Sequence, residues 1–336
     1  MKDTFLVITS IASDENHVLQ SYADYSRTHK IPFVVIGDRK SPLNFNLEGC
    51  DFYSLENQLE LNFGLVKNLP IGHYARKNLG YLIAMSKGAK KIIETDDDNL
   101  PFDSFWSDRE KTQQSYLIEQ GEWLNVYNYF SQEKIWPRGF ALDEIGKVLP
   151  NLSSKTTTLC PIQQGLADEN PDVDAIYRLL FPLPISFDKK DSIALGDGSI
   201  CPFNSQNTTW FEEAFPLMYL PSYCSFRMTD IWRSFIAQRI AWTCGWSILF
   251  HQSTVYQERN DHNLMHDFKD EVEGYLHNKL IMHELNMLSL ESGIENIPTN
   301  LIKCYSKLID LKLIGEEELS LLHNWLDDLK LIRDIQ

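Results

Sequence analysis

The stretch Ile92-Ile93-Glu94-Thr95-Asp96-Asp97-Asp98-Asn99 places three consecutive carboxylates directly after an apolar run typical of a buried strand. Two like charges about 4 Å apart repel by roughly 1 kcal/mol in water, and by more in a cleft of lower dielectric. Because alternate side chains of an extended segment point the same way, we expect Asp96 and Asp98 to face one cation and a ribose, with Asp97 supporting them. Such oxygen ligands suit Mg²⁺ or Mn²⁺ beside a substrate phosphate. An acidic turn without a ligand is the alternative.

The segment before this run, residues 74–89, has apolar residues at helical spacing and a glycine at position 88 as a C-terminal stop. A helix that leads into a strand indicates a crossover unit of an open α/β sheet, where ligands collect at the carboxyl ends of the strands. Arg76 and Lys77 fall in the first turn of this helix, so we expect them to contact a phosphate. Two solvated charges on a helix surface are the alternative.

Two further apolar runs, residues 5–9 and 31–36, are expected to be buried parallel strands, and residues 15–30 between them have helical spacing. Thr9 and Ser10 follow the first strand and Asp38 follows the second, in positions suited to a nucleotide. Asp38 is interpreted either as a base or ribose contact or as a turn residue. Neither G-x-G-x-x-G nor G-x-x-x-x-G-K-S/T occurs, which disfavours a dinucleotide-binding fold and a P-loop.

An acidic loop at residues 165–174 precedes a helix expected at residues 175–180. Carboxylates accept hydrogen bonds from sugar hydroxyls, so Asp168, Asp172 and Asp174 are candidate sugar or acceptor contacts. The preference of aspartate for helix N-termini is the alternative explanation.

Asp230 lies beside Arg227 at the start of another expected helix, which Thr229 or Asp230 would cap. In an inverting sugar transfer Asp230 would be the general base, with Arg227 at the sugar or acceptor; a capping role without chemistry is the alternative. His251 and His262 are candidates for a third metal ligand or a diphosphate contact, although a lone histidine near an apolar run is more often structural.

These motifs resemble those of a known family. Tyr74-Ala75-Arg76-Lys77-Asn78-Leu79-Gly80-Tyr81, leading into the acidic run, is similar to the STELLO-type glycosyltransferase-like proteins and more distantly to the reversibly glycosylated polypeptides, the UDP-arabinopyranose mutases. The resemblance continues through Trp136-Pro137-Arg138-Gly139-Phe140 and later blocks, over roughly residues 1 to 265. It implies a glycosyltransferase A-type fold, a Rossmann-like mixed α/β sheet flanked by helices, with a nucleotide-sugar donor held through a divalent cation.

The composition indicates a globular protein, because 43% of the 336 residues are hydrophobic. The net charge of −16 disfavours nucleic acid or an anionic membrane as the main partner. The chain has no apolar stretch of about 18 residues and no signal-peptide pattern, so we expect a cytoplasmic protein, or one acting at the cytoplasmic face of a membrane. Its six cysteines form no C-x-x-C pair, which predicts reduced thiols.

After residue 265, leucines recur at helical spacing with glycine and proline breaks, which predicts about three helices in residues 266–336. They could pack on the catalytic domain, residues 1–265, form a homo-oligomer contact, or bind a partner. The sequence thus predicts a metal-dependent glycosyltransferase that moves a sugar from a nucleotide donor, such as a UDP-sugar, to a glycan, lipid-linked or small-molecule acceptor. A nucleotide-sugar mutase and a non-catalytic nucleotide-sugar-binding scaffold are the alternatives.

Overall fold

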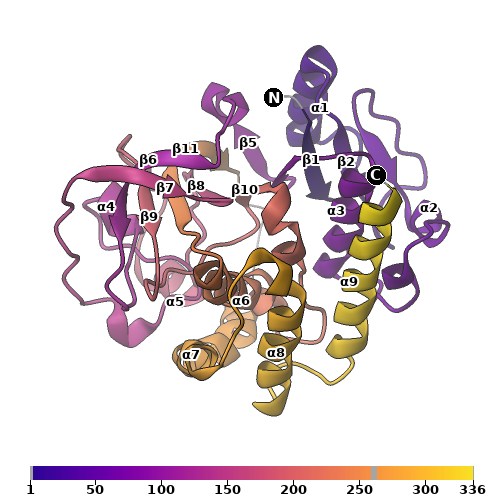
Figure 1. Cartoon of the computed structure of the whole chain (residues 1–336). Helices are drawn as coiled ribbons and strands as arrows, with labels where there is room; N and C mark the ends of the chain where they lie inside the picture. The colour runs from indigo at the N-terminus through magenta and orange to yellow at the C-terminus, as the bar shows by residue number, and fades with distance from the viewer. Residues whose placement is uncertain (1–2, 259–262, 336) are drawn as a thin grey trace.

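A mixed eleven-stranded sheet forms the centre of the fold in the computed structural model, which describes residues 3–258 and 263–335 (Figure 1). The strand order is β3-β2-β1-β4-β10-β8-β11-β9-β6-β7, and β5 pairs with β11. The strands are β1 (Thr4–Thr9), β2 (Phe33–Ile36), β3 (Asp51–Tyr53), β4 (Lys91–Thr95), β5 (Asn99–Pro101), β6 (Thr112–Ile118), β7 (Lys155–Leu159), β8 (Ile162–Asp168), β9 (Ile193–Leu195), β10 (Asn207–Phe211) and β11 (Ile248–Gln257). This confirms the predicted α/β class and the strands expected near residues 5–9, 31–36 and 92–95.

Helices pack on both sides of this sheet. The α-helices are α1 (His17–His29), α2 (Leu55–Leu59), α3 (Lys77–Ser86), α4 (Tyr127–Phe130), α5 (Ala175–Leu180), α6 (Thr229–Thr243), α7 (Leu264–Met287), α8 (Ile297–Asp310) and α9 (Glu318–Ile335). The predicted helices at residues 15–30 and 175–180, and the three in the C-terminal segment, are therefore confirmed. None of the helices in the described part of the chain has the length and hydrophobicity that crossing a membrane requires.

The first four strands are parallel, and their connections create a gap at one edge of the sheet. From β1 the chain moves outward through β2 to β3, and then returns to place β4 on the other side of β1. The connections that leave β1 and β4 therefore diverge, which opens a crevice at the carboxyl ends of these two strands. Thr9 and Ser10 stand on one side of this crevice and the acidic run stands on the other.

Alternating side chains of β1 bury opposite faces of the sheet. Leu6 and Ile8 belong to a cluster with Val18 and Leu19 of α1, whereas Phe5 and Val7 belong to the main core with α3. The period of two along the strand thus brings α1 to one face and α3 to the other. Helices α6, α8 and α9 extend the α3 side of the fold (Figure 1).

Helix α3 approaches the sheet closely at Gly80. A Cβ atom at this position would lie 2.6 Å from Cγ1 of Val7 and 3.0 Å from Cγ1 of Ile36. Contacts this short force either the helix or the strands to move, so the glycine sets the distance between α3 and the crevice.

We expect Gly80→Ala to lower the free energy of unfolding by about 1–3 kcal/mol, because overpacking outweighs the better helix propensity of alanine. Urea unfolding followed by circular dichroism measures this change. Gly146→Ala is the matched control, since a Cβ atom there meets nothing within 4 Å. Equal stability of the two variants would contradict the close approach.

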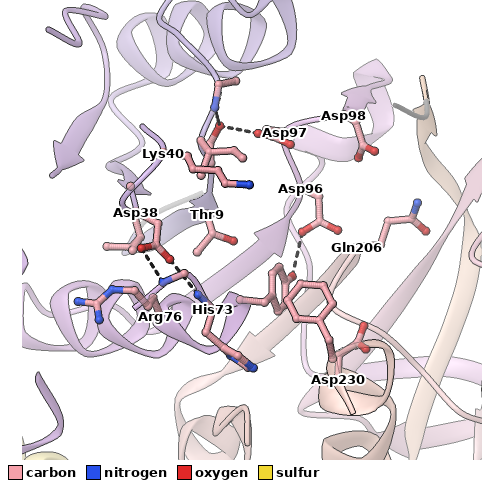
Figure 2. Close-up of a pocket in the computed structure, with 18 of the residues that line it drawn as sticks. Thr9, Asp38, Lys40, His73, Arg76, Asp96, Asp97, Asp98, Gln206 and Asp230 are labelled. Atoms are coloured by element: carbon pink, nitrogen blue, oxygen red, sulfur yellow. Dashed lines mark hydrogen bonds between the residues drawn. The ribbon is translucent and has the colours of Figure 1, made fainter. Parts of the chain in front are cut away.

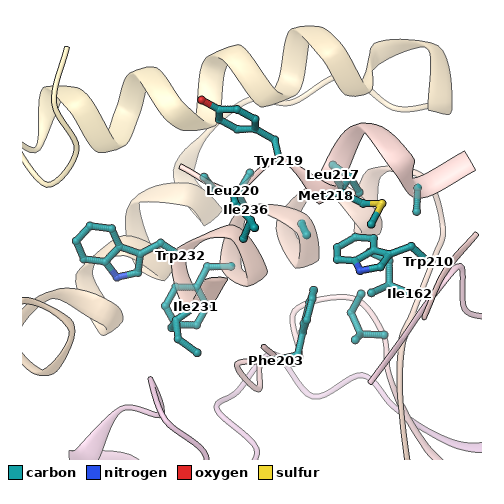
Figure 3. Close-up of a cluster of buried hydrophobic side chains, with 14 of the residues drawn as sticks. Ile162, Phe203, Trp210, Leu217, Met218, Tyr219, Leu220, Ile231, Trp232 and Ile236 are labelled. Carbon is teal, nitrogen blue, oxygen red and sulfur yellow. The ribbon is translucent and has the colours of Figure 1, made fainter. Parts of the chain in front are cut away.

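The second half of the sheet changes direction at β10, which is antiparallel to both of its neighbours, β4 and β8. Figure 3 shows the core beneath it, where Trp210 of β10 lies near Phe203 and the side chains of Trp232 and Ile236 project from α6. The rings of Trp210 and Phe203 are 5.8 Å apart. Tyr219 joins this core to the C-terminal helices, because its ring contacts those of Tyr305 in α8 and Trp325 in α9.

Buried carboxylates attach the C-terminal helices to segments that lead to the crevice. Glu318, at the start of α9, accepts hydrogen bonds from the backbone N–H groups of Ser222 and Tyr223, at 2.9 and 2.7 Å. Asp328, further along α9, accepts the N–H groups of Gly64 and Leu65, at 2.7 and 2.9 Å. Of the three roles predicted for this segment, packing on the rest of the fold is the one that these contacts realise.

Candidate functional site

A cleft of about 850 Å³ opens at the carboxyl ends of β1, β2 and β4. Figure 2 shows Asp96, Asp98, Gln206 and Asp230 along one side, facing Thr9, Asp38 and Lys40. Its lining includes six aspartates, Asp38, Asp96, Asp97, Asp98, Asp172 and Asp230, and six lysine or arginine residues, Arg39, Lys40, Arg76, Arg138, Arg178 and Arg227. The cleft is thus formally neutral in a chain whose net charge is −16, so an anionic ligand meets less repulsion here than the whole chain would produce.

The acidic run forms a turn rather than the predicted continuation of a strand. Strand β4 ends at Thr95, and the N–H of Asn99 bonds to the carbonyl of Asp96 at 3.3 Å. Strand alternation therefore does not decide where the carboxylates point. Asp97 accepts a hydrogen bond from Oγ of Ser10 at 2.5 Å, and Asp98 accepts one from Nε2 of Gln257 at 2.9 Å. All three carboxylates still line the cleft, but they do so from a tight turn.

A buried lysine, Lys77, holds Asp96 in position. Nζ of Lys77 donates to Oδ1 of Asp96 at 3.0 Å, to the hydroxyl of Tyr74 at 2.8 Å and to the carbonyl of Thr95 at 2.7 Å. The Lys77 side chain is fully buried and does not line the cleft, so it is not placed to make the predicted contact with a phosphate. The reason is the short 3₁₀ helix Tyr74–Arg76 (η2), which turns the start of α3 inward.

The acidic turn is electrostatically costly in this structure. Burial raises the pKa of Asp96, although Lys77 and Tyr74 oppose the shift. Burial also raises the pKa of Asp97, against the hydrogen bond from Ser10. Oδ2 of Asp96 accepts no hydrogen bond within the described part of the chain, and it remains available to a ligand. A hard cation is the kind of ligand that would relieve this cost.

His251 does not complete a metal site with these acids. Within residues 3–258 and 263–335, no three side chains of His, Cys, Asp or Glu stand in an arrangement ready to hold a metal ion. His251 is absent from the cleft lining; its Nδ1 lies 2.9 Å from the carbonyl of Gln252, and burial lowers its pKa to about 3. The prediction that it is a metal ligand is not realised, because the side chain lies elsewhere on β11. His262 lies outside the described residues.

Thr9, the last residue of β1, and Asp38, which follows β2, line the cleft as predicted, but in different ways. Thr9 has a buried hydroxyl without a hydrogen-bond partner among the residues described. The Asp38 carboxylate accepts the backbone N–H groups of Gly72 and His73 at 2.8 and 3.0 Å. Asp38 therefore fastens the loop before η2 while it also lines the cleft, and its contact with a base or ribose stays a prediction.

Arg76 also differs from its prediction. Its Nε donates to Oε1 of Gln58 at 2.7 Å, and its Nη1 donates to the carbonyl of Leu69 at 3.2 Å. The guanidinium, almost fully buried, thus connects α2 to the loop before η2 and is not presented to a phosphate as an open surface charge. Only Nη2 is left without a partner in the described structure.

Arg39 and Lys40 are the exposed cations that sequence reasoning missed. They follow Asp38 in the loop after β2, and Figure 2 shows Lys40 extending over the cleft. Neither side chain forms an ion pair or hydrogen bond with the described residues. A signal was present, because two adjacent cations directly follow a strand whose carboxyl end faces the cleft.

Arg138 forms a buried clamp between two carboxylates of the cleft. It binds Asp172 through Nε and Nη2, both at 2.8 Å, and Asp230 through Nη1 and Nη2 at 3.1 and 3.0 Å. Burial alone would raise the pKa of Asp230, but the charge and hydrogen bonds of Arg138 outweigh it and lower the pKa to about 2. The sequence showed Arg138 only as part of the motif at residues 136–140 and predicted no role for it.

Asp230 in this setting is poorly suited to the predicted role of general base. A carboxylate whose pKa is about 2 and whose oxygens both bind a guanidinium holds a proton weakly. The capping alternative is also wrong, because Met228 occupies the N-cap of α6 and no side chain caps it. Asp230 accepts the N–H of Ser205 at 3.2 Å as well, so it organises the floor of the cleft.

The other predicted sugar contacts divide into cleft and scaffold residues. Asp172 and Arg227 line the cleft, and Arg227 is held by Oε1 of Glu271 in α7 at 2.8 and 3.0 Å. Asp174 lies outside it as the N-cap of α5, where burial raises its pKa to about 6. Asp168 is also outside, and accepts the N–H of Phe187 at 2.9 Å. The helix-terminus explanation therefore applies to Asp174.

Comparison with known proteins identifies relatives of this chain. Residues 227–334 match the family model described as STELLO glycosyltransferases. The Arabidopsis thaliana protein named "Probable glycosyltransferase STELLO2" is 32% identical over 261 residues, which cover 71% of this chain and 34% of that protein. "Probable glycosyltransferase STELLO1" from the same plant is 30% identical over 247 residues, covering 67% and 32%. The chain spans about a third of the length of these curated relatives.

The segment matched by the family model begins at Arg227 and runs through α6 into α9. It therefore includes Asp230, and it also includes the helices after residue 265, which lie beyond the region over which the sequence motifs alone suggested a resemblance. The matches agree with the family that those motifs indicated, and the chain belongs to the STELLO glycosyltransferase family.

Proposed function

We propose that the protein is a metal-dependent glycosyltransferase of the A-type fold, which transfers a sugar from a nucleoside-diphosphate donor, such as a UDP-sugar, to an acceptor. The observation that carries this proposal is the cleft at the diverging connections of β1 and β4, with three aspartates in the turn after β4. Ligands of open α/β sheets bind at such a point. A volume of about 850 Å³ falls within the usual range for small-molecule sites.

The cation would bind through Asp96 and Asp98, whose oxygens are suitable ligands for Mn²⁺ or Mg²⁺. Such an ion, when bound, stabilises the negative charge that develops on a departing diphosphate. Asp97 would keep the turn in place through its hydrogen bond to Ser10. Lys77 would orient Asp96, because its ammonium group fixes Oδ1 and leaves Oδ2 directed toward a ligand.

The nucleotide would lie along the ends of β1 and β2. The unpartnered hydroxyl of Thr9 is available to a ribose or base. Arg39 and Lys40 replace Arg76 and Lys77 as the cations that would contact the diphosphate, because their charges are exposed and uncommitted to other described residues. Charge-assisted hydrogen bonds from such groups are stronger than neutral ones.

Thermal unfolding with a panel of nucleoside diphosphates and nucleotide sugars, each with Mn²⁺ and with EDTA, tests this proposal. A ligand at a hundred times its dissociation constant stabilises the folded state by about 2.7 kcal/mol. We expect such a shift for one nucleotide family, dependent on Mn²⁺, and we expect Asp96→Asn with Asp98→Asn to abolish it. Asp197→Asn is the matched control, because Asp197 is exposed and outside this cleft.

Different outcomes separate the alternatives. If no nucleotide shifts the transition of the wild-type protein, the donor site is absent and the proposal fails. If the shift is independent of the cation, the metal role fails. Rearrangement of the donor sugar without an acceptor would identify a mutase, and tight binding without turnover over a panel of acceptors would identify a scaffold.

A further inference from the structure

A second cleft, of about 470 Å³, adjoins the first on the side of the acidic turn. It is lined by Phe102, Glu169, Asn170, Tyr256, Gln257 and Glu258. Strand β5, which follows the acidic turn, pairs there with the end of β11, so that Tyr256 is opposite Leu100 and Gln257 is opposite Asn99. Gln257 lines both clefts, so the two clefts adjoin at this residue.

Residues 257 and 258 lie between the second cleft and the acidic turn, and they are hydrogen-bonded to that turn. Nε2 of Gln257 donates to Oδ2 of Asp98 at 2.9 Å, and the N–H of Glu258 donates to the carbonyl of Asp98 at 2.9 Å. Asn170 donates from Nδ2 to the carbonyl of Gln257 at 3.1 Å. A molecule in the second cleft would thus be separated from Asp98 by Gln257 and would lie next to the proposed donor site.

Two aromatic rings form one side of the second cleft. The centroids of Phe102 and Tyr256 are 5.3 Å apart with an angle of 32° between the rings, and both side chains are partly exposed. The N–H of Phe102 bonds to the carbonyl of Thr254 at 2.9 Å, which fixes the platform to β11. Aromatic faces are apolar and weakly negative, so they attract the polarised C–H groups on one face of a sugar ring.

Glu169 lines the same cleft as the two rings. Glu169 has a left-handed backbone with φ of 67°, which is strained for a residue other than glycine. Its peptide group is held in that conformation by paired bonds with Ile185 at 2.8 and 3.1 Å, while its carboxylate accepts no hydrogen bond from the described residues. An open carboxylate in the same cleft as two aromatic rings is suited to sugar hydroxyls, and it would repel an anionic ligand. The other acid of the lining, Glu258, is already engaged, because its Oε2 lies 3.0 Å from Nε2 of His17.

We propose that this second cleft is the acceptor subsite, and that it binds pyranose rings of a neutral oligosaccharide, with Phe102 and Tyr256 under the ring face and Glu169 at the hydroxyls. This proposal rests on the proposed transferase function, because the acceptor is placed relative to the donor cleft. The open carboxylate of Glu169 and the two aromatic rings favour a neutral sugar over a phosphorylated or acidic acceptor.

Saturation-transfer NMR and titration calorimetry with neutral oligosaccharides of three to six units, in β-1,4-glucan, β-1,3-glucan, xylan and mannan series, test the subsite. We expect at least one series to bind. Tyr256→Ala and Glu169→Gln should each raise its dissociation constant about tenfold or more, and leave nucleotide binding unchanged. Glu169→Gln keeps the size of the side chain, so it guards against a folding defect in Tyr256→Ala. Phe268→Ala is the control, because Phe268 and Tyr275 form a comparable ring pair on α7, 5.9 Å apart and outside both clefts.

The outcomes distinguish this proposal from the one on which it rests. Nucleotide binding without binding of any oligosaccharide would overturn the subsite and leave the donor site intact. Oligosaccharide binding that neither Tyr256→Ala nor Glu169→Gln weakens would also overturn it. The wild-type protein could instead bind no nucleotide but bind an oligosaccharide, more weakly in both variants. That outcome would retain the sugar site and refute the transferase function.

Discussion

Replacing Arg233 with methionine is expected to lower the free energy of unfolding by about 3–5 kcal/mol, because the change leaves a buried carboxylate without its partner. Arg233 donates from Nη1 and Nη2 to the oxygens of Glu94 at 3.0 and 2.8 Å, and both side chains are fully buried. Nε1 of Trp210 also donates to Glu94, at 2.8 Å. Chemical denaturation of Arg233→Met at neutral pH measures the loss.

The double variant Glu94→Gln with Arg233→Met is the control for this prediction. An amide at position 94 carries no charge, and its oxygen can still accept a hydrogen bond from Trp210 or Tyr81, so the double variant should recover part of the stability. A double variant that is no more stable than Arg233→Met would show that the loss came from packing instead of from an unpaired charge.

Arg138→Met is expected to produce a comparable loss, again of about 3–5 kcal/mol, with a pronounced pH dependence. In the wild-type protein Asp230, whose pKa is about 2, contributes stability that is complete above its unfolded pKa near 4 and is lost as the pH falls toward 2. Without the guanidinium, the burial that raises the pKa of Asp230 is opposed only by the charge of Arg233 and the N–H of Ser205, so we expect this pKa to rise. The variant then binds a proton more readily when folded, so its deficit relative to wild type should shrink as the pH falls from 7 to 4.

Urea unfolding of wild type and Arg138→Met across this pH range tests the sign of the effect. A deficit that stays constant from pH 7 to pH 4 would contradict a charge-based origin. Adding Asp172→Asn and Asp230→Asn to Arg138→Met removes both carboxylates that the arginine compensates. This triple variant should be more stable at neutral pH than Arg138→Met alone.

The periodic parts of the chain were predictable from sequence because burial leaves a regular pattern. Continuous apolar runs identified β1, β2 and β4, and helical spacing identified α1, α3 and the three C-terminal helices. The end of β4 also placed the acidic run at the crevice. These predictions needed only neighbours along the chain and the rule that ligands collect where parallel strands end.

The side-chain roles were less predictable, because they depend on partners far apart in sequence. Arg138 meets Asp230 across 92 positions, and nothing in the local pattern of either residue indicates the pair. Lys77 seemed suited to a phosphate until the turn at η2 directed it under Asp96. His251 lies on β11, and the apolar pattern of this strand did not predict whether the side chain points toward the cleft. Charged residues near the cleft thus divide into scaffold and open groups only in three dimensions.

The two carboxylates of α9 set a rule for recombining this chain with its relatives. Glu318 holds residues 222–223, in the segment that leads to Asp230. Asp328 holds residues 64–65, in the segment that leads to residues 72–73, which Asp38 binds. A chimaera that exchanges α9 alone would pair these backbone segments with acids from a foreign helix. Functional chimaeras are therefore expected to require a carboxylate at positions 318 and 328, so the arrangement of the cleft depends on the last helix.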